Sequence, residues 1–369
     1  MGACRACPGV GWGRRYAAPV ILRSLRQFAF RNLETTDVSF GEGVTAIVGA
    51  NAAGKSNLLD ACYLAVSGDL PSGRLGDALR WGSSEGFVAA LVERGDGDRH
   101  EVHVGLATGR KVLRLDGQAV RQGDVARVSA AVRITPEDAD LVHGAPALRR
   151  GWLDDLLRRL SRRYGALMRE YAKVLEQRNA GLREGVDGVL LDVFSDRLAE
   201  VGDEIGALRA RAMARVDALA RDVYGEVAGD AKTLDVALAR SQGELSLREA
   251  LRASEREERA RGVTVVGPHR DDVALTLEGR SVQTFGSRGE ARTAAMALRV
   301  AELRLLEELH GEPPILLLDD FSAELDAHRR TYLLSLSQRL PQALVSGTEP
   351  APHAGRLLQI AEGQVREDG

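Results

Sequence analysis

The sequence has 369 residues, a formal net charge of −3 at pH 7 and 44% hydrophobic residues. This length suits about two domains, and no stretch approaches the ~18 unbroken apolar residues that a membrane span needs. A charge this close to zero excludes a uniformly basic surface, so any contact with nucleic acid must come from a local patch. The three cysteines, an odd and low number, predict a reducing, cytoplasmic location. Residues 1–19 lack the apolar segment of a secretory signal and are predicted to form a disordered tail.

The segment that follows this tail is predicted to fold into strands around one helix. "VILRSLRQF" (20–28) and "VTAIV" (44–48) are rich in β-branched residues, which favours strands, and a helix is expected from Lys55 to Val66. Two alternating segments then flank the turn "GDGD" (95–98), and "KVLRL" comes after them. This pattern predicts an antiparallel meander.

The middle of the chain, residues 148–262, is predicted to be mostly helical. Apolar residues recur every three or four positions in "LRRGWLDDLLRRLSRRYGALMREYAKVLEQRNAGL", which predicts one long amphipathic helix from Leu148. A second helix is expected from about Gly188 to Val223, and a charged stretch occupies 247–262. Trp81 and Trp152 are expected to pack in the core, since isolated aromatic side chains usually do.

Strand-like composition returns in "VTVVGPHRDDVALTLEG" (263–279). A helix from about Arg288 to Leu309, the buried strand "ILLL" (315–318), a helix that ends near Leu340 and the strands "ALVS" and "RLLQI" complete the chain. The helical block is therefore predicted to be an insertion into one α/β domain, whose N- and C-terminal parts build a single sheet.

The segment "GANAAGKS", from Gly49 to Ser56, fits the pattern G-x-x-x-x-G-K-[ST] between a predicted strand and a predicted helix. Its glycines, Gly49 and Gly54, allow a tight turn whose backbone amides form a pocket for an anion with the start of the helix. Lys55 is expected to reach the β- and γ-phosphates of a nucleotide, and the Ser56 hydroxyl is expected to bind Mg²⁺. The alternative is a chance Gly-rich turn.

Two aspartates follow the buried strand "ILLL". Asp319 is placed where this strand would emerge at its carboxyl edge, which is where ligands bind in open α/β sheets. We expect Asp319 to hold Mg²⁺ through water and Asp320 to orient the attacking water. The alternative is a pair of aspartates that caps the next turn.

A serine-capped helix provides a second candidate for a phosphate contact. Ser287 and Glu290 form the S-x-x-E pattern of a capping box, and the cap alone is a sufficient structural reason for this serine. Gly289 in the first turn costs about 1 kcal/mol relative to alanine but permits close approach of another backbone. Because the phosphate loop already occupies one face of a nucleotide, we infer that this helix meets a nucleotide held by another copy of the chain.

Together these segments resemble the RecF family of ABC-type ATPases, which are related to SMC proteins. The resemblance extends from Val20 over nearly the whole chain. It rests on "FAFRNLE", "GANAAGKSNLLDACYLA", "ITPEDADLVHGAPALRRGWLD", "YAKVLEQRN", "VVGPHRDDVAL", "FGSRGEARTAAMALRVAE" and "ILLLDDFSAELD". It implies an α/β fold with an ABC-type ATPase head at 20–147 and 263–369, made of a mixed sheet with a P-loop helix plus an antiparallel β-subdomain. Residues 148–262 would be an inserted, mostly α-helical arm domain.

The resemblance also implies the roles of individual residues. Lys55 and Asp320 would be catalytic, and Ser56 and Asp319 would hold Mg²⁺. The residues implied to bind ATP in the same copy are Arg31, Asn32, Gly49, Asn51, Gly54, Lys55, Ser56 and Asn57. From a second copy, Ser287 and Gly289 of the signature motif would contact the same ATP, and Asp326 would lie at the dimer seam.

The sequence departs from the pattern of this family at several positions. Ala52 stands where glycine is usual, no glutamine of a Q-loop is visible in 136–146, and Ser346 and Thr348 occupy the stretch where a switch histidine would be. Because these accessory groups are missing, we expect a slow ATPase.

The function implied by the resemblance is ATP-dependent DNA binding in recombinational repair. Such a protein dimerises on ATP, clamps double-stranded and gapped DNA and assists recombinase loading, with RecR and RecO as partners and no membrane. Six arginines of the arm suggest a basic face for DNA, and a solvated helix face is the alternative. They are Arg149, Arg150, Arg158, Arg159, Arg162 and Arg163. The competing hypotheses are the ATP-hydrolysing subunit of a transporter, disfavoured by the large helical insertion, and a binding module with a decayed nucleotide site.

Overall fold

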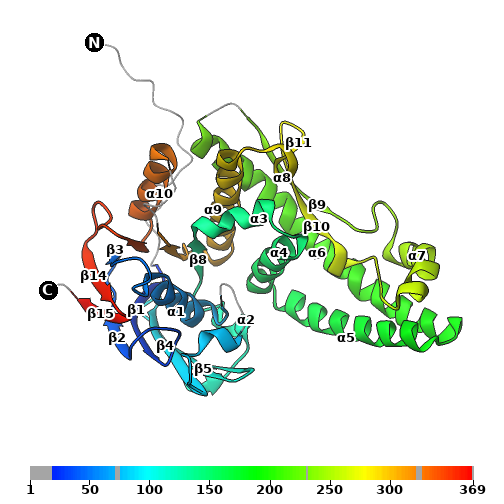
Figure 1. The fold of residues 1–369 in the computed structure, drawn as a ribbon, viewed down its shortest axis with the longest axis horizontal. Coiled ribbons are helices and arrows are strands. Elements are labelled where there is room, and N and C mark those ends of the chain that lie inside the picture. The colour runs from blue at the N-terminus through cyan, green and yellow to red at the C-terminus, as the bar shows by residue number, and fades with distance from the viewer. Residues whose placement is uncertain (1–18, 71–74, 230–231, 321–325, 368–369) are drawn as a thin grey trace, which may run out of the picture.

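The computed structural model describes residues 19–70, 75–229, 232–320 and 326–367. The predicted tail, apart from Pro19, lies outside these residues. The described chain contains two six-stranded sheets and one three-stranded sheet, with helices on both sides of the sheet that carries the phosphate loop (Figure 1). No helix within these ranges is both long and apolar enough to cross a membrane.

The mixed sheet unites the two ends of the chain, as the sequence predicted. Its order is β15-β14-β3-β13-β12-β8, and all neighbouring strands are parallel except β14 and β15. The strands are β3 (Gly43–Val48), β8 (Ala131–Ile134), β12 (Ile315–Leu318), β13 (Gln342–Gly347), β14 (Arg356–Ala361) and β15 (Gln364–Glu367). All four residues of β12 are buried, as expected for a parallel strand that is covered on both faces.

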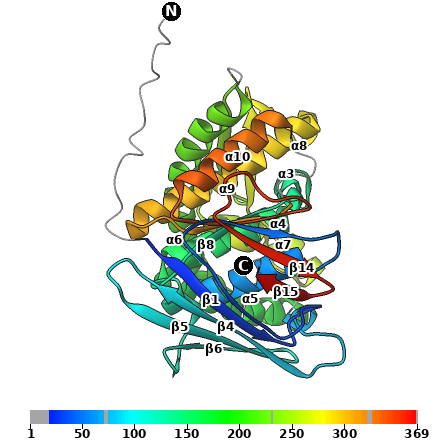
Figure 2. The same cartoon turned by 90° about the vertical axis from the view of Figure 1, so that its left-hand side faces the viewer.

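The antiparallel sheet has the order β2-β1-β4-β5-β6-β7 and contains the predicted meander. Its strands are β1 (Ile21–Phe28), β2 (Thr36–Ser39), β4 (Glu85–Glu93), β5 (Arg99–Ala107), β6 (Arg110–Leu115) and β7 (Gln118–Ala119). Helix α1 (Lys55–Ser67) packs between this sheet and the mixed sheet, and apolar side chains from all three form one core cluster. Figure 2 shows the antiparallel sheet on one side of the mixed sheet and helices α9 and α10 on the other.

The arm contains α4 (Pro146–Leu160), α5 (Arg162–Glu184), α6 (Gly188–Ala228) and α7 (Leu247–Arg261). The prediction of a single long helix from Leu148 was wrong, because the chain turns at Ser161. This residue has extended dihedral angles, and its side chain accepts a hydrogen bond from the backbone amide of Tyr164, so it caps α5. The apolar periodicity continues across this break and therefore did not reveal it. Helices α5 and α6 pack against each other and extend away from the head (Figure 1).

A three-stranded sheet joins residues on both sides of the predicted boundary at 262. Strand β10 (Asp272–Leu277) pairs with β9 (Leu234–Ala239) and with β11 (Arg280–Ser281). The strand-like segment 263–266 forms no strand, which corrects that expectation; it leads into Gly267, whose φ is 121°. The division into head and arm remains a prediction, and a second core cluster joins the arm helices to the mixed sheet.

Helix α9 (Arg288–His310) packs against α6 and forms the centre of this second cluster. The remaining helices are α2 (Gln122–Val125), α3 (Asp140–His143), α8 (Val282–Phe285), α10 (Ala327–Arg339) and the short turns η1 (Leu75–Ala78), η2 (Pro136–Ala139) and η3 (Pro268–Arg270). The predicted helices at 288–309 and before Leu340 correspond to α9 and α10.

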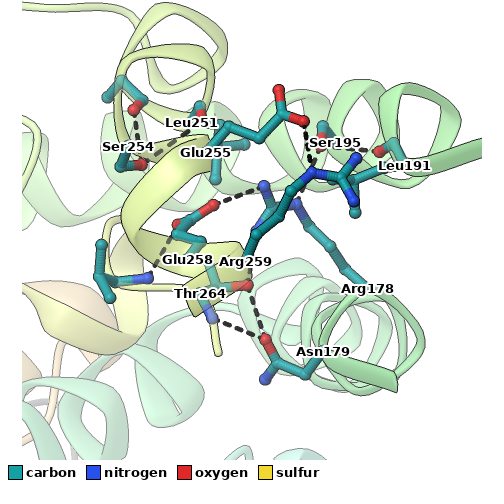
Figure 3. Close-up of polar contacts among 12 residues, drawn as sticks. Arg178, Asn179, Leu191, Ser195, Leu251, Ser254, Glu255, Glu258, Arg259 and Thr264 are labelled. Carbon is teal, nitrogen blue, oxygen red and sulfur yellow. Dashed lines mark hydrogen bonds and ion pairs between the residues drawn. The ribbon is translucent and has the colours of Figure 1, made fainter. Parts of the chain in front are cut away.

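Buried polar groups connect α5, α6 and α7 in the arm. Arg178 donates from Nη2 to Glu258 at 2.6 Å, from Nη1 to Thr264 at 2.8 Å and from Nε to Ser195 at 2.9 Å (Figure 3). Asn179 accepts hydrogen bonds from both the backbone amide and the hydroxyl of Thr264. The three nitrogens of this guanidinium are therefore all satisfied, as a buried charge requires.

Candidate nucleotide site

The predicted phosphate loop connects β3 to α1. A Cβ atom on Gly49 would lie 2.2 Å from the carbonyl oxygen of Ile360, so only glycine fits there. Helix α1 starts at Lys55 after Gly54, whose φ of 115° lies in the region that favours glycine. Ala52 has a φ of 63°, which makes glycine the less strained residue at this position.

Lys55 is buried within this loop. Its ammonium donates to the carbonyl oxygens of Gly49 and Ala50, both at 2.9 Å. Among the described residues no carboxylate lies within ion-pair distance of this ammonium. A buried cation at the start of a helix suits a phosphate.

Ser56, Asp319 and Ser346 meet where α1 faces the carboxyl ends of β12 and β13. Ser56 Oγ donates to Asp319 Oδ1 at 3.0 Å, and Ser346 Oγ donates to the same oxygen at 2.8 Å. The parallel pairing of the two strands brings their ends together. Hydroxyl and carboxylate oxygens are the ligands that Mg²⁺ prefers, so Ser56 and Asp319 fit the predicted metal. Ser346 was missed as a contact residue, although it ends an apolar run like the one before Asp319.

Asp320 follows directly and has a left-handed backbone conformation, with a φ of 46°. Its amide donates to Ser346 Oγ at 2.8 Å. Ser346 therefore contacts both predicted aspartates. A non-glycine residue at positive φ is a conformation often found at functional sites.

A network of charges extends from Asp319 into the head. Arg133, on β8, donates from Nη2 to Asp319 Oδ2 at 3.0 Å, and its Nη1 lies 3.1 Å from Asp60 Oδ1. Asp60, on α1, also pairs with Arg31. Burial raises the pKa of Asp60, and the positive charges of Arg133 and Arg31 oppose this effect. Sequence reasoning missed Arg133 and Asp60, because no local pattern relates residues on different elements.

Arg31, Asn32 and Asn57 lie along one side of the phosphate loop. Arg31 donates to Asn57 Oδ1 at 2.9 Å, and Asn57 donates to Asn32 Oδ1 at 2.6 Å. Asn32 Nδ2 lies 3.5 Å from the carbonyl oxygen of Ala52. The structure thus brings these three predicted residues together, while Asn51 is exposed in the loop.

The remaining predicted residues gather at the starts of α9 and α10. Ser287 caps α9 and is exposed, and Glu290 completes the capping box. Arg329, on α10, donates to the carbonyl oxygen of Gly289 at 2.7 Å and pairs with Asp326, the capping residue of α10. Lys232 and the cap hydrogen bonds lower the pKa of Glu290 to about 2. Because Ser287 is exposed, solvent reaches the start of α9, which was predicted to meet a second copy.

A cavity of about 540 Å³ opens beside Ser56 and Arg133, between α1 and β8 on one side and α4 on the other. Arg31, Ser56 and Arg133 line it from the head, and Trp152 and Arg159 line it from the arm. Ser56 and Arg133, which both contact Asp319, therefore border open space.

The structure differs from two expectations, the basic face suggested for the arm and the core position of Trp81. The six arm arginines do not form one free basic face, because Arg149 and Arg159 are buried and pair with Asp272 and Glu302. Arg158, Arg162 and Arg163 pair with Asp155, Asp124 and Glu204, and Arg150 donates to the carbonyl oxygen of Asp271. Trp152 is buried as expected, but Trp81 is 99% exposed.

Comparisons with known proteins identify the family of this chain. The family model of the RecF/RecN/SMC N terminal domain matches residues 21–349. A protein of Deinococcus radiodurans named DNA replication and repair protein RecF is 45% identical over 358 residues, which cover 95% of this chain and 99% of that protein. The protein of the same name from Deinococcus deserti is 45% identical over 343 residues, covering 93% and 94%. A solved structure of the recombination mediator protein RecF-ATP in the RecFOR pathway has a TM-score of 0.89 at 28% identity and covers 96% of this chain and 100% of that chain. The chain therefore belongs to the RecF family of SMC-like ABC ATPases.

Proposed function

We propose that this protein is an ATP-dependent DNA-binding protein of recombinational repair, and that two copies close on DNA when ATP is bound between them. The observation that carries the proposal is that one chain contains two separate half-sites. One is the phosphate loop with Lys55, Ser56 and Asp319, and the other is the exposed, serine-capped start of α9.

Within one copy, the loop amides and Lys55 would bind the phosphates of ATP. Ser56 and Asp319 would hold Mg²⁺, which neutralises charge on the phosphates when bound. Asp320 would orient water, and its backbone is fixed by Ser346. Ser346 and Thr348 occupy the stretch where a switch histidine would be, which supports slow hydrolysis.

In the second copy, the amides at the start of α9 would face the outer side of the same ATP. Ser287 and Gly289 allow close approach there, and Asp326 is held beside them through Arg329. Loss of the terminal phosphate would remove the shared ligand, so the two copies would separate and release DNA.

The relatives' names support the rest of the proposal. They are named DNA replication and repair proteins, and the similar solved structure is of a recombination mediator in the RecFOR pathway. We therefore propose double-stranded and gapped DNA as the ligand, RecR and RecO as partners, recombinase loading as the outcome and the cytoplasm as the location.

Sedimentation with and without ATP and Mg²⁺ tests the two half-sites. The wild-type chain should shift from monomer to dimer when both are added, and Ser287→Arg should bind ATP but stay monomeric because the large side chain blocks the approach of the second copy. Ser246→Arg is the matched control, since Ser246 forms the same capping box on α7. Equal dimerisation of both variants would refute the role of α9, and equal sedimentation of the wild type in all conditions would refute the dimer.

Asp320→Asn separates binding from hydrolysis. The variant should bind ATP and dimerise but hydrolyse ATP at least about 100-fold more slowly, in the range of a general base. Its complex with duplex DNA should therefore outlast that of the wild type when dissociation is followed by fluorescence anisotropy. Hydrolysis at the wild-type rate would exclude Asp320 as the group that orients water.

A further inference from the structure

Arg133 lies between the two buried carboxylates of the nucleotide site, and no sequence pattern singled it out. We propose that Arg133 is a positioning residue, which fixes the carboxylate of Asp319 toward Ser56 and links it to α9. The inference rests on the proposed role of Asp319 as a ligand of Mg²⁺. In this proposal Arg133, on β8, orients Asp319, which directly follows β12.

The two oxygens of Asp319 have different partners. Oδ2 accepts from Arg133 Nη2 at 3.0 Å, whereas Oδ1 accepts from the hydroxyls of Ser56 and Ser346 at 3.0 and 2.8 Å. A rotation of the carboxylate would break the contact to Arg133, which is the one of the three in which both partners are charged. Arg133 therefore fixes the plane of the carboxylate, so that the oxygen without a contact to Arg133 faces Ser56.

Arg133 is the one cation that pairs with both buried carboxylates in the described part of this site. Asp60 and Asp319 are almost fully buried, and Arg31 and Arg133 are their cationic partners. The Nε of Arg133 is buried without a hydrogen-bond partner in the described part of the chain. In the arm, by contrast, Arg178 uses all three of its nitrogens. Arg133 thus contacts two carboxylates, while its Nε makes no hydrogen bond with the described residues.

A short segment carries this contact to the helix that would meet the second copy. Arg133 is the third residue of β8, Thr135 caps η2, and Asp138 accepts from Arg299 of α9 at 2.7 and 2.9 Å. Residues 133–138 therefore connect Asp319 at one end to α9 at the other. A change in the Arg133–Asp319 contact displaces the segment that holds the helix capped by Ser287.

The test compares Arg133→Met, Arg133→Lys and Arg127→Met in the full chain. Arg127 is exposed and has no carboxylate partner among the described residues, so its variant is the control. Binding of a fluorescent ATP analogue is measured with Mg²⁺ and with EDTA, together with hydrolysis and the thermal midpoint. In the presence of Mg²⁺, Arg133→Met should bind the ATP analogue about 10–100-fold more weakly than the wild type does, as for residues that orient metal ligands. In EDTA, its affinity for the analogue should stay within about threefold of the wild-type value. Arg133→Lys keeps the charge but not the two-sided contact, so its loss should be smaller.

The double variant Arg133→Met with Asp60→Asn separates positioning from charge balance, with Asp60→Asn alone as reference. It removes one cation and one anion, so it should recover the thermal midpoint without recovering the Mg²⁺-dependent affinity or hydrolysis. Recovery of the thermal midpoint, the Mg²⁺-dependent affinity and hydrolysis would show that Arg133 merely neutralises Asp60. The inference would also be overturned if Arg133→Met and Arg127→Met had the same Mg²⁺-dependent affinity and hydrolysis. A wild-type chain without Mg²⁺-dependent binding of the analogue would instead refute the proposed nucleotide site itself.

Discussion

In the arm and in the nucleotide site, arginines pair with buried carboxylates, but the two regions differ in how completely these groups are satisfied. In the arm, Arg178 uses all three nitrogens, and Glu258 also accepts from the backbone amide of Val265 at 2.9 Å. In the site, Arg133 Nε has no partner in the described ranges, and Lys55 contacts only carbonyl oxygens.

This difference is the one expected between groups that stabilise the fold and groups that would bind a ligand. A buried charge is tolerated when the protein supplies every partner, and it then contributes to a defined packing arrangement. A buried charge with incomplete partners beside a cavity costs stability unless a ligand completes it. Substitutions in the arm should therefore change the free energy of unfolding, and substitutions in the site should change binding.

The largest effect is expected from Arg178→Met. This change leaves Glu258 buried without its cation, which typically costs about 3–5 kcal/mol, and urea unfolding measures the loss. The folded fraction should still bind ATP like the wild type, because Arg178 lies in the arm. Arg178→Met with Glu258→Leu should recover most of the stability; a single variant as stable as wild type would contradict the structural role of the cluster.

Lys55→Met should produce the opposite pattern. ATP affinity should fall by about 30-fold or more, the effect of removing one member of a buried charge pair, as measured by titration of a fluorescent ATP analogue. The free energy of unfolding should change little, since no carboxylate loses a partner. Lys173→Met, at an exposed position of α5, is the control. Unchanged affinity in Lys55→Met would place the phosphates elsewhere.

A pH dependence is expected from His269, which contacts Tyr171 at 2.8 Å. Burial lowers the pKa of His269 from 6.5 to about 4. Because the folded value lies below the unfolded one, the unfolded chain binds the proton first as the pH falls, and stability is lost between pH 6.5 and about 4. The free energy of unfolding should fall by about 3 kcal/mol over this whole range, and about 2 kcal/mol of this loss should be complete at pH 5.

Urea unfolding at pH 7.5 and pH 5 measures this loss, which should be smaller in His269→Gln by roughly that amount. His143→Gln is the control, because His143 is exposed. If the two variants lose the same stability on acidification, the buried imidazole is not its source.

The smallest effect is expected from Arg163→Ala. Arg163 pairs with Glu204 at the surface, where water screens the interaction. The thermal midpoint should not change measurably, and DNA binding measured by anisotropy should stay close to wild type, since the carboxylate already neutralises this arginine. A clear loss of DNA affinity would restore the basic face that the sequence suggested.

The sequence revealed what depends on neighbours along the chain. The phosphate loop, the acids after β12 and the capping box of α9 are local patterns with a physical cause, and the structure places them as expected. Arg133 and Asp60 were missed, because their contact joins β8 to α1 across about 70 residues and leaves no periodic signal.

The failures have physical reasons as well. Ser161 ends α4 although the apolar spacing continues, because its hydroxyl caps the next helix. The arm arginines were expected to be free, but several of their carboxylates come from distant elements, such as Asp272 on β10 and Glu302 on α9. Trp81 is exposed in a loop whose neighbouring residues, Leu79 and Arg80, contact Phe30 and Ala29 through the backbone.

Helix α6 gives the molecule a mechanical property. Its 41 residues make a rod about 60 Å long, which packs against α9 along part of its length and against α5 and α7 elsewhere. A pivot of roughly 5° at one end of such a rod displaces the other end by about 5 Å. Force applied at the distal end of the arm is therefore delivered, as torque, to the helix on which the two copies would close.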